Sequence, residues 1–203
     1  MTQPSVAKRV EPNEKLLFLR RWFANPLKVG ALLPSSPALA RLVARSVRRR
    51  SGEAVVELGA GPGAVTKILL RSGIPVDRLF VVEIDPDLCA FLRREVPQAR
   101  IIQGDATRLA EVLPPEIVGK VGTVISGIPM VTLPLEVQQR MVDSWFGVLA
   151  PGGHMLQYTY SLVSPLPEAK LGLKGRRCGI AMRNLPPAWV WSYVRSDSGR
   201  RAA

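Results

Sequence analysis

The sequence is poor in the residues that build disulfide frameworks and metal sites. Its 203 residues include two cysteines, Cys89 and Cys178, and one histidine, His154. Two cysteines are too few for a disulfide framework, and a chain with reduced thiols is the expectation. No spacing of His, Cys, Asp or Glu is typical of a metal site, so we expect no metal cofactor.

Long apolar segments are also missing. The longest uncharged stretch, Val121 to Leu135, has 15 residues and is interrupted by Gly127, Pro129 and Pro134. It is too short and too broken for a transmembrane helix. Residues 1–15 contain no apolar run, so we expect no secretory signal and a cytoplasmic protein. With 47% hydrophobic and 22% charged residues, the composition is that of one globular domain.

Basic residues outnumber acidic ones, and they gather at the two ends of the chain. The formal net charge is +12, divided into +9 for residues 1–50, −3 for 51–164 and +6 for 165–203. The excess therefore belongs to a surface that favours polyanions, either nucleic acid or an anionic membrane. Composition alone does not choose between these two.

Short apolar runs alternate with helical patterns along the middle of the chain. The predicted strands are Ala54–Leu58, Leu79–Glu83, Arg100–Gln103, Val121–Ser126 and His154–Tyr160, with Cys178–Met182 and Trp189–Val194 as a closing antiparallel pair. The predicted helices are Pro37–Arg49 with Ser36 as N-cap, Ala64–Ser72, Pro86–Glu95 capped by Asp85, and Leu135–Leu149. This alternation predicts an α/β fold with a parallel sheet covered by helices.

A glycine-rich loop follows the first predicted strand. Gly59, Gly61 and Gly63 come directly after Val55-Val56-Glu57-Leu58, where the strand turns into a helix. Glycines at such a turn allow a sharp bend and the close approach of a ligand to the backbone. The spacing is G-x-G-x-G, which differs from the dinucleotide-binding pattern.

Two acidic residues follow the next two predicted strands. Glu83 ends the second strand, where a carboxylate can bind both hydroxyls of a ribose. Gly104-Asp105-Ala106 follows the third, where a carboxylate can accept from an adenine amino group. The carboxyl ends of adjacent parallel strands are the usual ligand site of such sheets.

These features resemble the class I S-adenosylmethionine-dependent methyltransferases, which share the glycine loop, the Glu after strand two, the Gly-Asp-Ala and the Pro-Gly-Gly before strand five. The resemblance implies a Rossmann-like, mostly parallel seven-stranded sheet with helices on both faces. It also implies a bound S-adenosylmethionine, with S-adenosylhomocysteine as product. The residues that it assigns to the cofactor are Glu57, Gly59, Gly61 and Gly63 near the methionine end, Glu83 and Ile84 at the ribose, Asp105 and Ala106 at the adenine, and Ser35 and Ser36 from the preceding segment.

The segment after the fourth strand bears on the methyl acceptor. Enzymes that methylate a base nitrogen carry Asn or Asp and then an aromatic residue here, because the ring stacks on the base. This chain has Ser126-Gly127-Ile128-Pro129-Met130 instead. A ribosomal RNA adenine dimethyltransferase-like enzyme is therefore disfavoured, and nucleic acid is an unlikely partner.

The remaining motifs resemble the bacterial phospholipid N-methyltransferases. The shared segments are 30–36, 126–129, 157–160 and Asn184-Leu185-Pro186-Pro187-Ala188. The resemblance implies stepwise methylation of phosphatidylethanolamine to phosphatidylcholine, with ornithine lipid as an alternative acceptor. It implies catalytic roles for Tyr158, Tyr160, Ser126 and Gly127, and substrate contacts by Ile128, Pro129, Arg183 and Asn184, the last two at a lipid phosphate.

An amphipathic helix is predicted from about Asn13 to Ala24. Its membrane-binding residues are expected to be Leu16, Phe18, Leu19, Arg20, Arg21, Trp22 and Phe23. Packing of this helix on the domain is the alternative. We predict three parts, namely a membrane-binding segment at 1–29, the methyltransferase domain at 30–195 and a flexible tail at 196–203. The protein is then expected on the inner face of the cytoplasmic membrane, bound to an anionic surface and a phospholipid substrate.

For the chemistry we expect catalysis by proximity and desolvation, with the proton lost to water or to a weak acceptor. His154 follows Gly153 at the amino end of strand five, away from the site, and is expected to be structural. Two other functions stay open. One is a nucleic-acid methyltransferase that holds RNA by its basic ends, and the other is a non-catalytic membrane-binding protein that keeps a cofactor fold.

Overall fold

The computed structural model describes residues 35–196. The chain divides into two units, Met1–Leu33 and Pro34–Ala203, and the second contains the whole described fold. The predicted N-terminal helix with its membrane-binding residues lies outside the described residues, as does the boundary expected at residue 29. Both therefore stay predictions.

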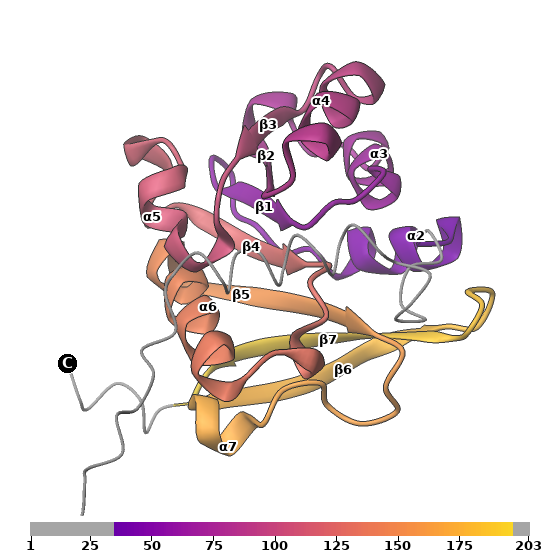
Figure 1. Cartoon of the computed structure of the whole chain (residues 1–203), viewed down its shortest axis with the longest axis vertical. Helices are drawn as coiled ribbons and strands as arrows, with labels where there is room; N and C mark the ends of the chain where they lie inside the picture. The colour runs from indigo at the N-terminus through magenta and orange to yellow at the C-terminus, as the bar shows by residue number, and fades with distance from the viewer. Residues whose placement is uncertain (1–34, 197–203) are drawn as a thin grey trace, which may run out of the picture. The chain divides into compact units, whose positions relative to one another are not determined.

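A seven-stranded sheet forms the centre of the fold, in the order β3-β2-β1-β4-β5-β7-β6 (Figure 1). The strands are β1 (Ala54–Leu58), β2 (Leu79–Glu83), β3 (Arg100–Gln103), β4 (Val121–Ser126), β5 (Leu149–Thr159), β6 (Leu173–Ala181) and β7 (Ala188–Arg195). The pairs among β1 to β5 are parallel, and β7 is antiparallel to both β5 and β6. The predicted fold class is confirmed, and β1 to β4 have the predicted bounds.

Strand β5 begins earlier than expected. The prediction treated Pro151-Gly152-Gly153 as a turn before a strand at His154, whereas β5 starts at Leu149. Its register against β4 jumps from the pair Val121–Leu149 to the pair Thr123–His154. The Pro-Gly-Gly residues are therefore a bulge within the strand, which a local pattern does not distinguish from a turn.

Helices cover the sheet. They are α2 (Pro37–Ser46), α3 (Ala64–Arg71), α4 (Pro86–Glu95), α5 (Leu109–Val112), α6 (Leu135–Val148) and α7 (Glu168–Leu171). Short 3-10 turns lie at Val76–Arg78, Ala106–Arg108, Pro115–Ile117 and Met130–Thr132. None of the helices within residues 35–196 is long and apolar enough to cross a membrane.

Helix α2 shows how the local sequence sets an element. Ser36 caps it by accepting from the Leu39 amide at 3.2 Å, as predicted, and Leu39, Ala40 and Val43 on its inner side are buried. The helix ends at Ser46, three residues before the expected end. The backbone N–H of Arg48 instead donates to Thr123 on β4 at 3.1 Å, so a tertiary contact draws the chain out of the helix.

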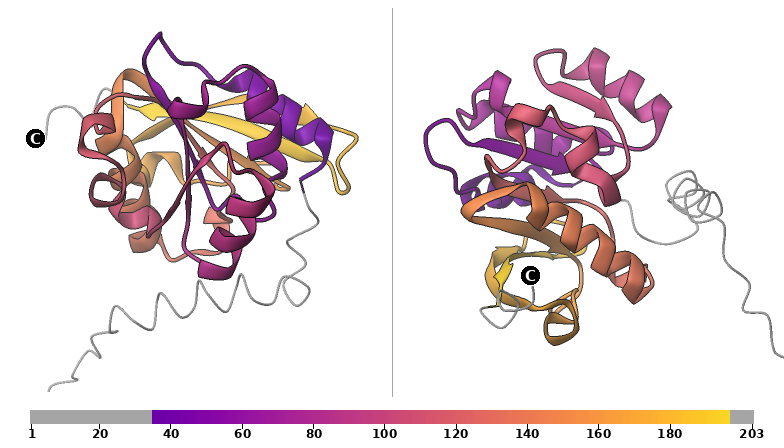
Figure 2. Two further views of the ribbon diagram at one scale, coloured as in Figure 1. Left: turned by 90° about the horizontal axis from the view of Figure 1, so that it is seen from above. Right: turned by 90° about the vertical axis from the view of Figure 1, so that its left-hand side faces the viewer.

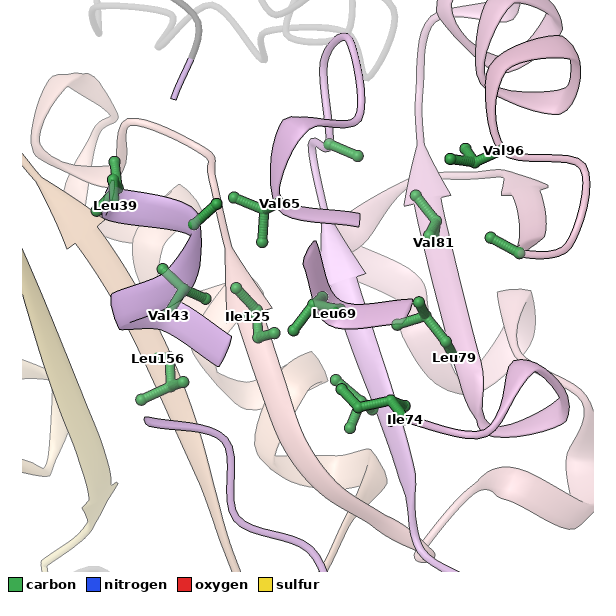
Figure 3. Packing of buried hydrophobic residues seen from close by; sticks show 14 of the residues in the cluster. Leu39, Val43, Val65, Leu69, Ile74, Leu79, Val81, Val96, Ile125 and Leu156 are labelled. Atoms are coloured by element: carbon green, nitrogen blue, oxygen red, sulfur yellow. The ribbon is translucent and has the colours of Figure 1, made fainter. Parts of the chain in front are cut away.

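The core on one face of the sheet joins α2, α3 and α4 to the strands. Figure 3 shows the side chains of Val43, Leu69, Ile125 and Leu156 packed together there. Strands β1, β2 and β4 are buried along their whole length, as expected of parallel strands between two helical layers. Figure 2 shows the helices on both sides of the sheet. This packing holds the C-terminal ends of β1, β2 and β4 in line. The side of the sheet at which these parallel strands end is here named the carboxyl edge.

Candidate active site

The loop after β1 depends on its glycines. Gly59, Gly61 and Gly63 have φ values of 65°, 53° and 79°, all in the left-handed region that other residues rarely adopt. A Cβ on Gly63 would lie 2.9 Å from Leu92, whereas one on Gly61 would meet no heavy atom of the described chain within 4 Å. The loop thus presents bare backbone at Gly61, which suits close approach of a ligand.

Glu57 is buried directly beneath this loop. Only 1% of its surface is exposed, and its Oε2 accepts from the Thr66 hydroxyl of α3 at 2.7 Å. Its Oε1 has no hydrogen-bond partner within residues 35–196. Burial raises the pKa of Glu57 to about 7, and the nearby Glu83 carboxylate adds to this rise. A buried carboxylate oxygen without a partner calls for a donor from a bound molecule.

Glu83 repeats this pattern at the end of β2. Its Oε1 accepts from the amides of Ile84 at 2.8 Å and Asp85 at 3.2 Å, which fixes the carboxylate. Its Oε2 is buried and likewise lacks a hydrogen-bond partner in the described part of the chain. Burial raises the pKa of Glu83, against the lowering effect of the backbone amides of Asp85, Ile84 and Gly61 that face the carboxylate. A pair of ligand hydroxyls would satisfy this oxygen.

The loop after β3 is held by residues from elsewhere in the fold. Asp105 accepts from the Thr107 amide at 2.8 Å, so one carboxylate oxygen caps the turn at Ala106–Arg108. The Ala106 carbonyl accepts from the Trp145 indole of α6 at 2.8 Å. Sequence reasoning missed Trp145, because nothing local links it to a loop 39 residues away.

The segment after β4 is held by two internal hydrogen bonds. Ser126 is fully buried, and its hydroxyl accepts from the Ile128 amide at 3.2 Å. Ile128 is also buried, and its carbonyl accepts from Gln157 at 2.9 Å. These bonds shape the turn and leave Pro129 half-exposed, and the expected catalytic role of Ser126 and the expected substrate contacts of Ile128 and Pro129 stay predictions.

Gly127 is constrained by close neighbours. A Cβ there would collide with the Tyr158 hydroxyl and lie 2.7 Å from the Gly59 carbonyl. The turns after β1 and β4 and the end of β5 therefore meet at this glycine. Gln157, whose neighbours the sequence analysis singled out, supports the turn from the other face of β5.

Tyr158 lies on β5 and Tyr160 directly follows the strand, and both pack against the core cluster that includes residues of α2 and α3. The Tyr158 hydroxyl is hydrogen-bonded to the Ser35 side chain. Burial raises the pKa of Tyr158, with the Glu57 carboxylate adding to the rise, so the phenol stays neutral and does not serve as a base. The structure thus brings Tyr158, Ser35, Glu57 and the glycine loop together.

Asn184 is hydrogen-bonded within the fold, and its expected contact with a lipid phosphate stays a prediction. It is 3% exposed, its Oδ1 accepts from the Ser36 amide at 2.9 Å, and its Nδ2 donates to the Pro186 carbonyl at 2.7 Å. Together with the capping role of Ser36, these bonds tie the β6–β7 turn to the start of α2. Arg183, by contrast, is exposed.

His154 lies away from this site. It pairs with Thr123 near the start of β4, is 2% exposed, and has its Nε2 3.3 Å from the Ser46 carbonyl. Burial lowers its pKa to about 4, so the imidazole is neutral at physiological pH. Residues 35–196 contain no group of three or more His, Cys, Asp or Glu side chains arranged to hold a metal ion.

The sheet order, the glycine loop and the buried carboxylates of Glu57 and Glu83 agree with the expected fold of a class I S-adenosylmethionine-dependent methyltransferase. Comparison with known proteins agrees. Residues 55–153 match a family described as a methyltransferase domain. An ornithine lipid N-methyltransferase of Singulisphaera acidiphila is 34% identical over 183 residues, which cover 86% of this chain and 93% of that protein. The chain therefore belongs to the S-adenosylmethionine-dependent methyltransferase family that includes this relative.

Other known proteins match this chain over a shorter stretch of sequence, or resemble it in fold and not in sequence. A ribosomal RNA small subunit methyltransferase A of Acidithiobacillus ferrooxidans is 42% identical over 72 residues, only 34% of this chain and 26% of that protein. A TehB-like methyltransferase from Corynebacterium glutamicum has a TM-score of 0.57 at 15% identity, covering 92% of this chain and 100% of that one. The glycopeptide N-methyltransferase MtfA, solved with S-adenosylmethionine, has a TM-score of 0.51 at 21% identity, covering 78% and 65%.

The cofactor of this family is S-adenosylmethionine, and the site suits it. The bare backbone at Gly61 leaves room for a ligand, and the free oxygens of Glu57 and Glu83 are acceptors for its donors. Both carboxylates lie at the ends of adjacent strands.

Proposed function

We propose that this protein transfers methyl groups to the amino group of an ornithine lipid. The observation that carries the proposal is the likeness to the ornithine lipid N-methyltransferase, which spans 93% of that protein. The methyltransferase-domain match covers residues 55–153 alone, so the longer likeness includes segments outside the cofactor half.

Phosphatidylethanolamine, which the sequence analysis put first, becomes the second candidate acceptor. The two lipids differ in the group beside the amine, because ornithine carries a carboxylate and phosphatidylethanolamine a phosphate. Arg183 is exposed in the β6–β7 turn and is proposed to pair with this anionic group. A guanidinium binds either anion through two parallel hydrogen bonds, so Arg183 suits both lipids.

The proposed roles at the cofactor follow the geometry. Gly59, Gly61 and Gly63 offer bare backbone to the methionine end, and Glu57 places its free oxygen beside it. Glu83 accepts from the ribose hydroxyls, and Asp105 accepts from the adenine. When bound, S-adenosylmethionine supplies an electrophilic methyl group carried on a sulfonium.

The acceptor amine must be neutral and held in line with that methyl. Gly127 and Pro129 form the backbone edge where the amine would lie, and the neutral phenol of Tyr158 borders it without adding charge. Each transfer would form one nitrogen–carbon bond as one sulfur–carbon bond breaks, with S-adenosylhomocysteine as the leaving group. After the first and second transfers the ammonium would lose its proton to water, whereas a third transfer would give a quaternary ammonium that has no proton to lose. Orientation and exclusion of water account for the catalysis in this proposal.

The test uses the full chain with isotope-labelled S-adenosylmethionine and vesicles that contain ornithine lipid, phosphatidylethanolamine or both. We expect label in mono-, di- or trimethylated ornithine lipid, identified by mass spectrometry. Label in phosphatidylethanolamine alone would replace the acceptor with the second candidate. Label in neither lipid, with cofactor binding confirmed by calorimetry, would overturn the proposal. A ribosomal RNA arm in the same assay tests the nucleic-acid alternative.

We also propose that the protein works at the inner face of the cytoplasmic membrane as a peripheral protein. A lipid acceptor has its amine at the bilayer surface, and a net charge of +12 favours an anionic surface. The predicted helix at residues 13–24 is one candidate for the contact.

A further inference from the structure

Large apolar side chains are exposed at one edge of the sheet. Eight such side chains are exposed within residues 35–196, and six of them lie in or beside the connections at the carboxyl edge. We name these six the apolar rim: Val131 and Leu135 after β4, Leu162 and Val163 after β5, and Met182 and Leu185 between β6 and β7. The other two, Val76 and Val194, lie at the opposite edge.

The sheet topology brings the three connections to the same edge. Strands β4 and β5 are parallel, and β6 runs in their direction because both β5 and β6 are antiparallel to β7. Figure 1 shows the connection after β5 and the β6–β7 turn at the ends of their strands. Glu83 ends β2 and Glu57 is the residue before the last of β1 at this edge, so the apolar rim borders the candidate active site.

These connections are unusual in charge and composition. Residues 127–135, 160–167 and 182–187, which hold all six rim side chains, contain no Asp or Glu and one basic residue, Arg183, and the exposed Glu136 follows Leu135 in the first turn of α6. They contain six prolines, which restrict the backbone and hold apolar side chains outward at a small cost in entropy. The rim side chains at Leu162, Val163, Met182 and Leu185 are 67 to 78% exposed. A cluster of this size in water indicates a contact surface.

Internal contacts join the connections to one another and to α2. Arg177 donates to the Leu162 carbonyl at 3.4 Å, and its guanidinium lies 4.4 Å from the ring centre of Trp189 on β7. Asn184 ties the β6–β7 turn to the start of α2, whose outer side exposes Arg41 and Arg45. The rim side chains thus lie on connections that are held by internal contacts, with Arg side chains beside them.

We propose that the apolar rim inserts into the outer layer of an anionic lipid bilayer and so brings the active site to the headgroups. Apolar side chains in connections that hold Arg183 and no carboxylate match a surface that is apolar below and anionic above. RNA would leave the exposure of six large apolar side chains unexplained, and a soluble protein partner would leave the absence of acidic groups in these connections unexplained. The inference rests on the proposed lipid acceptor, and it adds a contact apart from the predicted N-terminal helix.

The first test reads the insertion of single positions in the full chain. An environment-sensitive fluorophore is placed at Leu162→Cys or Leu185→Cys in a Cys178→Ser background, with Val76→Cys as the matched control at the opposite edge. With vesicles of phosphatidylcholine and phosphatidylglycerol, we expect a several-fold rise in emission at both rim positions and quenching by spin labels in the acyl chains. The Val76 probe should not respond. Rim probes that stay unchanged on vesicle-bound protein would overturn the inference, as would a wild-type chain that does not bind these vesicles.

The second test uses charge. The double variant Leu162→Glu/Leu185→Glu is expected to bind the vesicles at least about 10-fold more weakly than the matched pair Val76→Glu/Val194→Glu, because a carboxylate is excluded from the bilayer and repelled by anionic lipid. Unchanged S-adenosylmethionine affinity in both pairs shows that each still folds. Equal vesicle binding of the two pairs would sink the inference.

The two proposals fail in different ways. Inserted rim probes without methylated lipid would contradict the proposed function and leave the rim as a membrane contact. Methylated ornithine lipid with silent rim probes would contradict the inference and leave the function standing.

Discussion

At the scale of single residues, the site depends on carboxylates that the fold buries before any ligand binds. Glu57 and Glu83 each use one oxygen within the protein, and each keeps a second, buried oxygen without a partner in residues 35–196. Such an arrangement costs stability in the free protein, and a ligand that supplies donors recovers that cost. The two residues that lower the stability of the ligand-free protein are therefore the ones that favour binding of the ligand.

Glu83→Gln tests the ribose assignment. Because hydrogen bonds to a charged group contribute roughly 1.5–3 kcal/mol, the variant should bind S-adenosylmethionine about 10-fold to 100-fold more weakly by calorimetry. Glu95→Gln is the matched control, since Glu95 is an exposed carboxylate paired with Lys67 at 2.8 Å. Equal affinities of the two variants would refute a role for Glu83 in the cofactor site.

Gly61→Ala tests whether the ligand approaches the backbone of the glycine loop. Comparison with Gly73→Ala separates the effect of backbone strain from the loss of space for the ligand. Gly61 and Gly73 both have a left-handed φ, and a Cβ on either would meet no heavy atom of the described residues within 4 Å. Alanine at either position should lower the free energy of unfolding by about 1–2 kcal/mol. We expect Gly61→Ala alone to weaken cofactor binding, and the comparison with Gly73→Ala removes the effect of strain. Unchanged affinity in Gly61→Ala would mean that the ligand does not approach this backbone.

The raised pKa of Glu57 predicts a pH dependence of stability. The carboxyl holds its proton more tightly in the folded chain, with a pKa of about 7 against an ordinary value of 4.5. The cofactor-free protein should therefore lose stability as pH rises from 4.5 to 7, by up to about 3 kcal/mol from this group. Urea unfolding at pH 5 and pH 8 measures this loss, which Glu57→Gln should reduce. A variant with the same pH dependence as the wild type would show that Glu57 is not the titrating group.

At the scale of elements, the predicted strands β1 to β4 are confirmed at both ends, because each is a short apolar run bounded by residues that end strands. The errors lie where distant parts of the chain intervene. Helix α2 stops early because Thr123 of β4 binds the Arg48 backbone, and β5 starts early because Leu149, before the bulge, pairs with Val121 of β4. Neither partner is local in sequence, so the local patterns carry no sign of them.

Trp145→Phe tests how α6 supports the loop after β3. The variant keeps a ring in the core and removes the N–H that donates to the Ala106 carbonyl. Leaving that carbonyl unpaired should cost about 1–3 kcal/mol of stability. Since Asp105 lies in the same loop, cofactor affinity should also fall several-fold. Trp191→Phe is the control, because its indole N–H has no partner among the described side chains and backbone. Equal losses of stability and cofactor affinity in both variants would show that Trp145 acts through the packing of its ring and not through its hydrogen bond.

At the scale of the whole molecule, charge and apolar surface are expected to act together at the membrane. The basic residues gather in the two ends of the sequence, and the apolar rim lies at the carboxyl edge of the sheet. Attraction of cations to an anionic surface falls with added salt, whereas burial of apolar side chains is less sensitive to it. Salt titration of vesicle binding therefore separates the two contributions.

Removal of residues 1–24 tests the predicted N-terminal helix. Residues 1–24 hold five Lys or Arg and two Glu, and each basic residue near an anionic surface contributes about 1 kcal/mol. The truncated chain should bind anionic vesicles more weakly in sedimentation assays, while its cofactor affinity stays the same. Vesicle binding that survives the truncation unchanged would show that this segment is not the anchor.

The sequence by itself determined the α/β class, the bounds of the first four strands, the glycine loop and the position of the acidic residues. These depend on short-range properties, namely the apolar runs and the ability of glycine to adopt a positive φ. Only the tertiary structure decided which polar atoms are used and which stay free. Ser36 and Asn184 are 148 residues apart, and Ala106 and Trp145 are 39 apart, so the order of the strands brings each pair together. The apolar rim is also a feature that only the tertiary structure decided. Whether a side chain is exposed depends on every neighbour that could cover it, and the sequence does not name those neighbours.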